Sequence, residues 1–169
     1  MSAETPATFD PAAAAERAFR DALGQFGTGV TIVTCMTPDG PIGITANSFS
    51  SLSLEPPMVL WAPAKSSSRY PFFMAAERFA IHVMGADQFD VCRGFAKRGN
   101  AFDEFDWEEG EDGVPLLTRC LSRFECTRAA AHDGGDHSIV VARVTRVTLN
   151  SGKPLLFFGG EYGSFEKAS

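Results

Sequence analysis

Residues 30–47 read VTIVTCMTPDGPIGITAN, and further strand and turn patterns follow them along the chain. The first eight residues are rich in β-branched side chains, which favour a strand. The next segment, residues 37–40, is a turn, because its proline sets the bend and its Asp-Gly pair tolerates positive φ. The segment PIGITAN then returns as a second strand. The stretch therefore predicts a β-hairpin.

Further strands are predicted on the C-terminal side of this hairpin. They lie at residues 58–63, at 78–84, in a long pair at 116–131 and 137–149, and in a final hairpin at 154–165. Helices are few: residues 11–26, begun by Asp10 and Pro11 and stopped by Gly27, and a short segment between Asp87 and Lys97. The pattern predicts a mainly β fold with α additions, a closed or split antiparallel β-barrel.

The length of 169 residues suits a single domain at 10–169, with residues 1–9 as a flexible N-terminal tail. The acidic stretch at 99–113 is predicted to be a solvated loop. A net charge of −6 argues against nucleic acid as a partner. The sequence has no long apolar run and no signal-peptide pattern, so we expect no membrane contact and a cytoplasmic protein. The four cysteines lack CxxC spacing and are expected to be free, mostly buried thiols.

Several catalytic patterns are missing. Gly27-Thr28-Gly29 enters a strand rather than a helix, which is the wrong context for a dinucleotide fingerprint. The sequence has no phosphate loop, no HExxH, no GxSxG and no histidine near a cysteine pair, so we expect no metal site. If Asp136 and His137 begin a strand, their side chains point to opposite faces and cannot pair with each other. Hydrolase, kinase and metalloenzyme functions are therefore disfavoured.

Three polar segments remain as candidates for function. TANSFSSLS (45–53) offers donors to a flat polar ring, or it caps its own backbone. PAKSSSRYP (63–71) is an anion-binding nest before a helix, or an N-cap followed by surface charge, and FAKR (95–98) can supply a second anion-binding element. GGDHSIVV (134–141) brings a histidine to the start of a strand beside a glycine pair, or it is a tight turn with an exposed histidine.

Together these segments resemble the short-chain flavin reductase family, which includes the reductase components of two-component aromatic monooxygenases. The resemblance runs from about Phe19 to Phe165, and its landmarks are FGTGVTIVT (26–34), GITANSFSSLSLEPPMVL (43–60), KSSS (65–68), FAKRG (95–99) and GDHSIVVARV (135–144). It implies an FMN-binding split barrel of Greek-key type, usually a homodimer with flavin near the subunit interface. Two positions depart from the family pattern: Ala142-Arg143 stands where many members have Gly-Glu, and Glu55 precedes the prolines.

The resemblance also implies roles for individual residues. The isoalloxazine ring of FMN or FAD is expected along Thr45, Ala46, Asn47 and Ser48. The ribityl phosphate is expected near Ser50, Ser51, Lys65, Ser66 and Ser67, with Phe95, Ala96 and Lys97 completing the phosphate end. His137 is expected where the nicotinamide of NADH or NADPH stacks on the flavin.

The implied activity is hydride transfer from the nicotinamide to the flavin, with the reduced flavin passed to a partner oxygenase. This chemistry needs positioning rather than a protein nucleophile. Two alternatives remain open at this point. One is a split-barrel flavoprotein that reduces another acceptor, such as a corrinoid or ferric iron. The other is a non-catalytic flavin-binding module.

Overall fold

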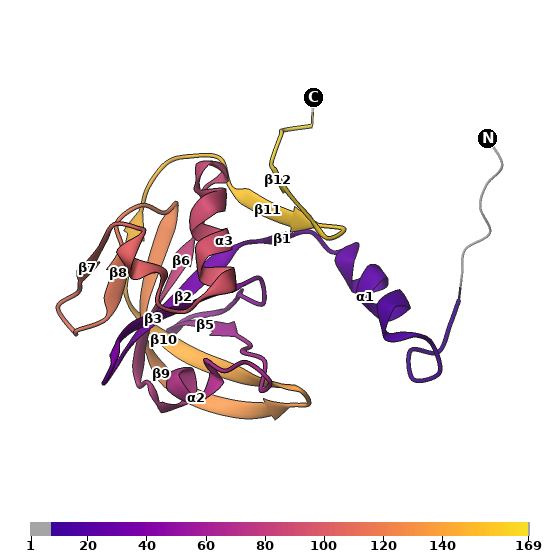
Figure 1. The fold of residues 1–169 in the computed structure, drawn as a ribbon, viewed down its shortest axis with the longest axis horizontal. Coiled ribbons are helices and arrows are strands. Elements are labelled where there is room, and N and C mark those ends of the chain that lie inside the picture. Colours follow the sequence, from indigo (N-terminus) through magenta and orange to yellow (C-terminus); the bar gives the residue numbers. More distant parts are fainter. Residues whose placement is uncertain (1–7, 169) are drawn as a thin grey trace.

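A computed structural model describes residues 8–168 of the chain, so the predicted tail at residues 1–9 falls almost wholly outside the described residues (Figure 1). The described chain is mainly β, as predicted. Its largest unit is a seven-stranded antiparallel sheet in the order β3-β2-β6-β9-β10-β5-β4. Its strands are β2 (Thr31–Thr37), β3 (Gly40–Ala46), β4 (Ser50–Leu54), β5 (Pro57–Trp61), β6 (Arg78–Val83), β9 (Ser122–Gly134) and β10 (His137–Leu149).

Two smaller sheets and three α-helices complete the described fold. One sheet has the order β1-β11-β12 and the other pairs β7 with β8. The strands are β1 (Thr28–Gly29), β7 (Trp107–Glu109), β8 (Pro115–Leu117), β11 (Leu155–Phe158) and β12 (Glu161–Ser164). The helices are α1 (Glu16–Gly24), α2 (Tyr70–Ala75) and α3 (Phe89–Lys97), with short 3₁₀ turns η1 (Ala86–Gln88) and η2 (Ala101–Asp103).

The three predicted hairpins are all present. In the first, Thr31 pairs with Ala46 and Thr37 with Gly40, which closes the turn at the predicted place. The second, β9–β10, is the longest pairing and runs from Gly134 opposite His137 to Ser122 opposite Leu149. The third joins β11 to β12.

The seven-stranded sheet is strongly curled. Its two edge strands, β3 and β4, do not pair with each other, yet only Asn47, Ser48 and Phe49 connect them. In a flat sheet six strand spacings would separate these edges by about 29 Å. Ala46 and Ser50 are four residues apart, so the chain between them spans at most about 14 Å. The sheet therefore bends round until its edges approach.

Two apolar clusters occupy the sides of this curled sheet. The larger lies inside the curl and brings together buried side chains from five strands, including Val33, Trp61, Ile81, Cys126 and Val140. The other packs α3 against the sheet and contains Ile32, Met84 and Phe95. Because Ile32 and Val33 are adjacent on β2, they face opposite sides, so both faces of this strand are covered.

Helix α1 is shorter than predicted and stands apart from the sheets (Figure 1). It begins at Glu16 rather than Pro11, because the Asp10 side chain caps an isolated turn by accepting from the Ala12 amide at 2.9 Å. The extended backbone of Ala15 separates that turn from the helix. None of the residues of α1 is buried.

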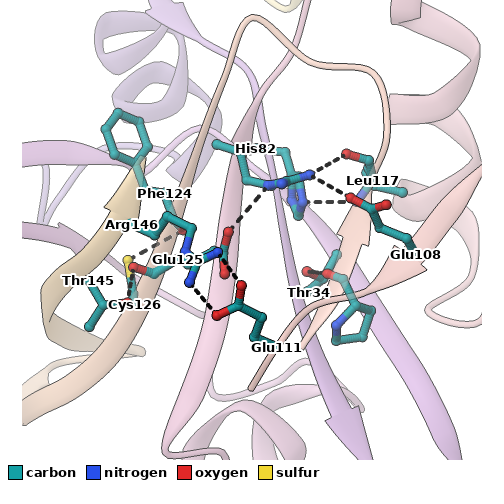
Figure 2. Close-up of polar contacts among 12 residues, drawn as sticks. Thr34, His82, Glu108, Glu111, Leu117, Phe124, Glu125, Cys126, Thr145 and Arg146 are labelled. Atoms are coloured by element: carbon teal, nitrogen blue, oxygen red, sulfur yellow. Dashed lines mark hydrogen bonds and ion pairs between the residues drawn. The ribbon is translucent and has the colours of Figure 1, made fainter. Parts of the chain in front are cut away.

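The prediction of a solvated loop at 99–113 is wrong. The segment contains η2, where Ala101 and Phe102 are buried, and strand β7, which pairs with β8. Its acidic side chains form ion pairs with arginines on neighbouring elements: Asp103 and Glu104 with Arg98, Glu111 with Arg146, Asp112 with Arg78, and Glu108 with Arg123 (Figure 2 shows those of Glu108 and Glu111). Aromatic residues between the acids give this segment its packing against α3 and the sheet.

A buried histidine, His82, joins three strands, and Figure 2 shows its contact with Leu117. The Nδ1 atom of His82 on β6 lies 3.0 Å from the carbonyl oxygen of Ile32, and its Nε2 atom accepts the amide N–H of Leu117 at 3.1 Å. Because a carbonyl oxygen only accepts, the proton sits on Nδ1 and the ring is neutral. Burial lowers the pKa of His82 to about 4. A protonated ring would present a second donor to the Leu117 N–H.

We predict that His82 makes the protein less stable as the pH falls from 6.5 towards 4. Above 6.5 the ring is neutral in both states. Between 6.5 and about 4 the unfolded chain binds a proton that the folded chain does not. The free energy of unfolding should therefore fall by roughly 3 kcal/mol over this window.

Urea unfolding at a series of pH values measures this change. The variant His82→Gln keeps an acceptor for Leu117 and does not titrate, so its pH dependence should be flatter. The control His132→Gln changes an exposed histidine of β9 and should keep the wild-type slope. Equal slopes in the wild type and in His82→Gln would contradict the prediction.

Candidate functional site

A pocket of about 270 Å³ lies at the end of β3. It joins two segments that the sequence analysis assigned to one cofactor, because Thr45, Ala46 and Asn47 line it together with Ala96 of α3. The remaining wall is mainly apolar and comes from the chain before β2 and from the C-terminal hairpin: Val30, Phe157 and Tyr162. The pocket therefore combines polar groups at one edge with an apolar wall.

Gly43 and Arg69 hold α3 against β3 beside this pocket. A Cβ atom on Gly43 would lie 2.6 Å from the ring of Phe95, so only glycine permits this approach. The guanidinium of Arg69 donates to the carbonyl oxygens of Phe95, Ala96 and Gly43. The sequence analysis placed Arg69 in an anion-binding nest, but here its donors bind backbone carbonyls at the end of α3.

Two of the predicted ring-binding side chains make hydrogen bonds within the protein. The Thr45 hydroxyl donates to the Cys92 carbonyl at 2.7 Å. The Ser48 hydroxyl accepts the Ala62 amide at 2.9 Å and donates to the Ala62 carbonyl at 3.1 Å. Both therefore cap backbone, which was the alternative interpretation of this segment. Asn47 is exposed, and its side chain makes no hydrogen bond within residues 8–168.

The predicted phosphate-binding residues do not gather around one pocket but lie on β4, in the segment at 65–67 and at the end of α3. Ser50 and Ser51 lie exposed on the edge strand β4, outside the lining of the pocket. Ser66 is exposed, and the Ser67 hydroxyl accepts the amide of Arg69 at 3.2 Å. Lys97 lines a separate hollow of about 390 Å³ with Arg93 and Arg98. Arg69 is the link between the segment at 65–67 and the end of α3.

The loop after β5 is joined to the turn between β9 and β10. The amide of Lys65 donates to the carbonyl of Asp136 at 2.8 Å, and the amide of Ser138 donates to Pro63 at 3.1 Å. The Lys65 ammonium also bonds to the carboxylate of Asp133 and, at 2.6 Å, to the carbonyl of Gly135. The hydrogen bond between Lys65 and Asp133 raises the pKa of the lysine and lowers that of the carboxyl.

His137 and Asp136 do form a pair, which corrects the expectation from the sequence. The Nδ1 atom of His137 lies 2.8 Å from Oδ1 of Asp136. The expectation assumed that both residues belong to one strand, but β10 begins at His137 and Asp136 lies in the turn. Gly135, at φ +79°, redirects the chain so that the strand alternation does not apply to Asp136. The hydrogen bond from His137 lowers the pKa of Asp136.

The cysteine thiols neither line the pocket nor form disulfides. All four cysteines are unpaired and buried, as expected, and burial raises the pKa of Cys35, Cys92 and Cys126 to about 12. Within the described residues, no three acidic, histidine or cysteine side chains gather as metal ligands would. None of the helices in residues 8–168 has the length and apolar character needed to cross a bilayer.

Comparison with known proteins identifies the family. A model of the flavin reductase like domain matches residues 23–166. The chain belongs to this family. One relative, the FMN reductase (NADH) SmoA of Agrobacterium fabrum, is 55% identical over 94% of this chain and 91% of its own length. The reductase subunit HsaB of a flavin-dependent monooxygenase from Mycobacterium tuberculosis is 40% identical over 89% of this chain and 82% of its own.

A solved structure supports the same assignment. The NADH:FAD oxidoreductase SgcE6 of Streptomyces globisporus superposes with a TM-score of 0.91 and 35% identity, covering 99% of this chain and 96% of that one.

The present chain also has a larger hollow, of about 570 Å³, between η1 and the loops that follow β8 and β10. No residue from the predicted sites lines that hollow, so the pocket at the end of β3 remains the candidate site.

Proposed function

We infer that the chain is an NAD(P)H-dependent flavin reductase, which transfers a hydride from nicotinamide to FMN or FAD and supplies the reduced flavin to a partner monooxygenase. The observation that carries this inference is the adjacency of two polar regions. Ser48, next to the pocket residue Asn47, bonds to Ala62, and the following loop bonds to the turn that holds His137. This adjacency supports neighbouring places for the flavin and nicotinamide rings.

The chemistry of the pocket suits a flavin. The flavin supplies the hydride acceptor at N5, and the protein supplies position and polarity. In our proposal the flavin ring packs against the apolar wall of Phe157 and Tyr162, and its polar edge faces Asn47 and the backbone at 45–48; Thr45, Ala46 and Asn47 line the pocket. Charge develops at that edge on reduction, so fixed donors there favour the reaction. The relatives support this reading, because one is an FMN reductase using NADH and another is a monooxygenase reductase subunit.

The remaining assignments follow from the same site. In our proposal, Thr45 to Ser48 border the ring, and Ser50, Ser51, Lys65, Ser66 and Ser67 serve the ribityl phosphate with Phe95, Ala96 and Lys97. His137 contacts the nicotinamide. The strong curl of the sheet favours a split barrel of Greek-key type within one domain at 10–169, and four unpaired thiols fit the reducing cytoplasm.

We also propose a homodimer. Helix α1 exposes Phe19 and Leu23 at helical spacing, and Phe26, beyond the end of the helix at Gly24, is exposed as well. A nine-residue helix is marginal without tertiary packing. Phe158 and Phe165, at the C-terminal hairpin, are also more than half exposed. The exposed apolar surface suits a twofold partner. Because β1 pairs with β11, which carries Phe157 of the pocket wall, the interface would adjoin the flavin.

The activity test is NADH and NADPH oxidation with added FMN, FAD or riboflavin. A reductase oxidises the nicotinamide in proportion to free flavin, whereas a binding module does not. In Asn47→Leu the flavin KM should rise about twofold to tenfold, because one hydrogen bond is lost. The exposed Asn100→Leu serves as the control. An unchanged KM in folded Asn47→Leu would remove Asn47 from the ring site.

The phosphate end can be tested by comparing FMN with riboflavin. Loss of a charged hydrogen bond costs roughly 1.5–3 kcal/mol, so Lys97→Ala and Lys65→Ala should raise the KM for FMN about tenfold or more and leave riboflavin less affected. Lys65→Ala should also raise the KM for NADH, because it releases the turn that holds His137. Equal losses on both flavins would show that neither lysine binds the phosphate.

The assembly can be tested by light scattering at micromolar concentration. The wild type should be a dimer, and Leu23→Asp with Phe26→Asp should produce monomers with weaker flavin binding. Gln25→Asp adds a carboxylate at an exposed position of the same segment and should remain dimeric. A stable monomeric wild type with full reductase activity would contradict the proposal.

A further inference from the structure

The pairing of Asp136 with His137 determines which hydrogen bond the imidazole can offer to a ligand. A carboxylate only accepts hydrogen bonds, so the 2.8 Å contact requires a proton on Nδ1 of His137. The hydrogen bond lowers the pKa of Asp136, which keeps the carboxylate ionised. In the neutral imidazole the other nitrogen, Nε2, then carries a lone pair and is a hydrogen-bond acceptor.

The turn that carries Asp136 is fixed from two sides. Gly135 supplies the positive φ that directs Asp136 out of the strand. Lys65 holds the same turn by its amide, which donates to Asp136, and by its ammonium, which bonds to Asp133 and Gly135. Ala64 also forms a bridge with His137. The backbone of Asp136 is therefore held beside His137, and the exposed Asp136 carboxylate bonds to one side of the half-buried imidazole.

We propose that Asp136 is a positioning residue that fixes His137 with Nε2 as an acceptor, so that the site selects pyridine nucleotides whose C3 substituent carries an N–H donor. This inference rests on the proposed function, in which His137 contacts the nicotinamide. The carboxamide of NADH has such an N–H donor. An acetyl group at the same ring position has only a carbonyl oxygen, which cannot donate to Nε2.

The reduced 3-acetylpyridine analogue of NADH is therefore the probe. The measured quantity is kcat/KM for NADH divided by kcat/KM for the analogue, at saturating flavin. The intrinsic difference in hydride donation between the two nucleotides is the same for every variant and cancels when variants are compared. A change in this ratio therefore reports on the contact to the C3 substituent.

The ratio should fall roughly twofold to tenfold in Asp136→Asn, because an amide can donate to Nδ1 and allow Nε2 to carry the proton. Asp136→Ala, which removes the partner entirely, should give a similar fall. His137→Ala should lower the ratio to the same extent. The double variant Asp136→Asn with His137→Ala should have the same ratio as His137→Ala alone, because Asp136 acts on the ratio only through the imidazole that this variant lacks.

The control Asp39→Asn makes the same change in the exposed turn between β2 and β3 and should keep the wild-type ratio. A melting curve for each variant separates loss of stability from loss of selectivity, since a purely structural role lowers the melting temperature and leaves the ratio unchanged.

Each outcome identifies what fails. A wild type without flavin reduction overturns the proposed function itself. An unchanged ratio in His137→Ala removes His137 from the nicotinamide site and this inference with it. A lowered ratio in His137→Ala with a wild-type ratio in both Asp136 variants, or additive effects in the double variant, overturns the role of Asp136 alone and leaves the proposed function standing.

Discussion

The antiparallel pairing of β9 with β10 is the constraint on which the rest of the structure depends. Strand β9 carries β6, β2 and β3 on its outer side, and β10 carries β5 and β4. The pairing of β9 with β10 therefore positions both polar regions of the candidate site, because the pocket follows β3 and the loop at 63–65 follows β5. Two register shifts within the ladder, between Val141 and Ala142 and between Val144 and Arg146, increase its twist. A twisted central ladder lets the sheet curl until its edges approach.

The interior of the curl needs neutral groups, and the sequence supplies them. The thiols of Cys35 and Cys126 there are protonated because burial raises their pKa. On the other face of the sheet, His82 is neutral because burial lowers its pKa. Most charged pairs lie at the surface, where arginines hold the acidic segment between η2 and β8. Arg123 and Glu125 on β9 form a largely buried pair at 3.8 Å, and neither lines the pocket. The body of the fold can therefore stay rigid near neutral pH without buried ion pairs at the ligand pocket. Hydride transfer needs this rigidity, because it depends on the distance and orientation of two stacked rings.

The hairpins were predictable because their signals are local. Alternating β-branched residues with Asp-Gly or Gly-Gly between them specify strand, turn and strand within a few residues. The segments 45–47 and Ala96 were also assigned to one site in advance, although the resemblance to a family, rather than any spacing, brought them together. By contrast, the roles of Thr45, Ser48 and Arg69 depend on backbone groups that are distant in the sequence. No local pattern reveals those partners.

Three other predictions were wrong, each for its own physical reason. The segment 99–113 looks solvated because its acids outnumber its aromatics, but the arginines that neutralise it come from four different parts of the chain: Arg78, Arg98, Arg123 and Arg146. The pairing of Asp136 with His137 was missed because β10 begins at His137, so Asp136 lies in the turn, where strand alternation does not apply. The first helix was predicted to begin too early, at residue 11, because a capped turn at Asp10 has the same sequence signals as a helix start.

An open seam also explains why the site lies where it does. A fully closed barrel would pair β3 with β4 and use their backbone donors and acceptors in strand pairing. Here the two edges meet no strand partner, and Asn47, Ser48 and Phe49 cross between them. In our proposal a ligand reaches backbone groups at this crossing, where Asn47 is exposed and the side chains of Ala46 and Ser48 are short. A flat ring with a polar edge can use such groups, whereas a closed barrel would leave it only side chains.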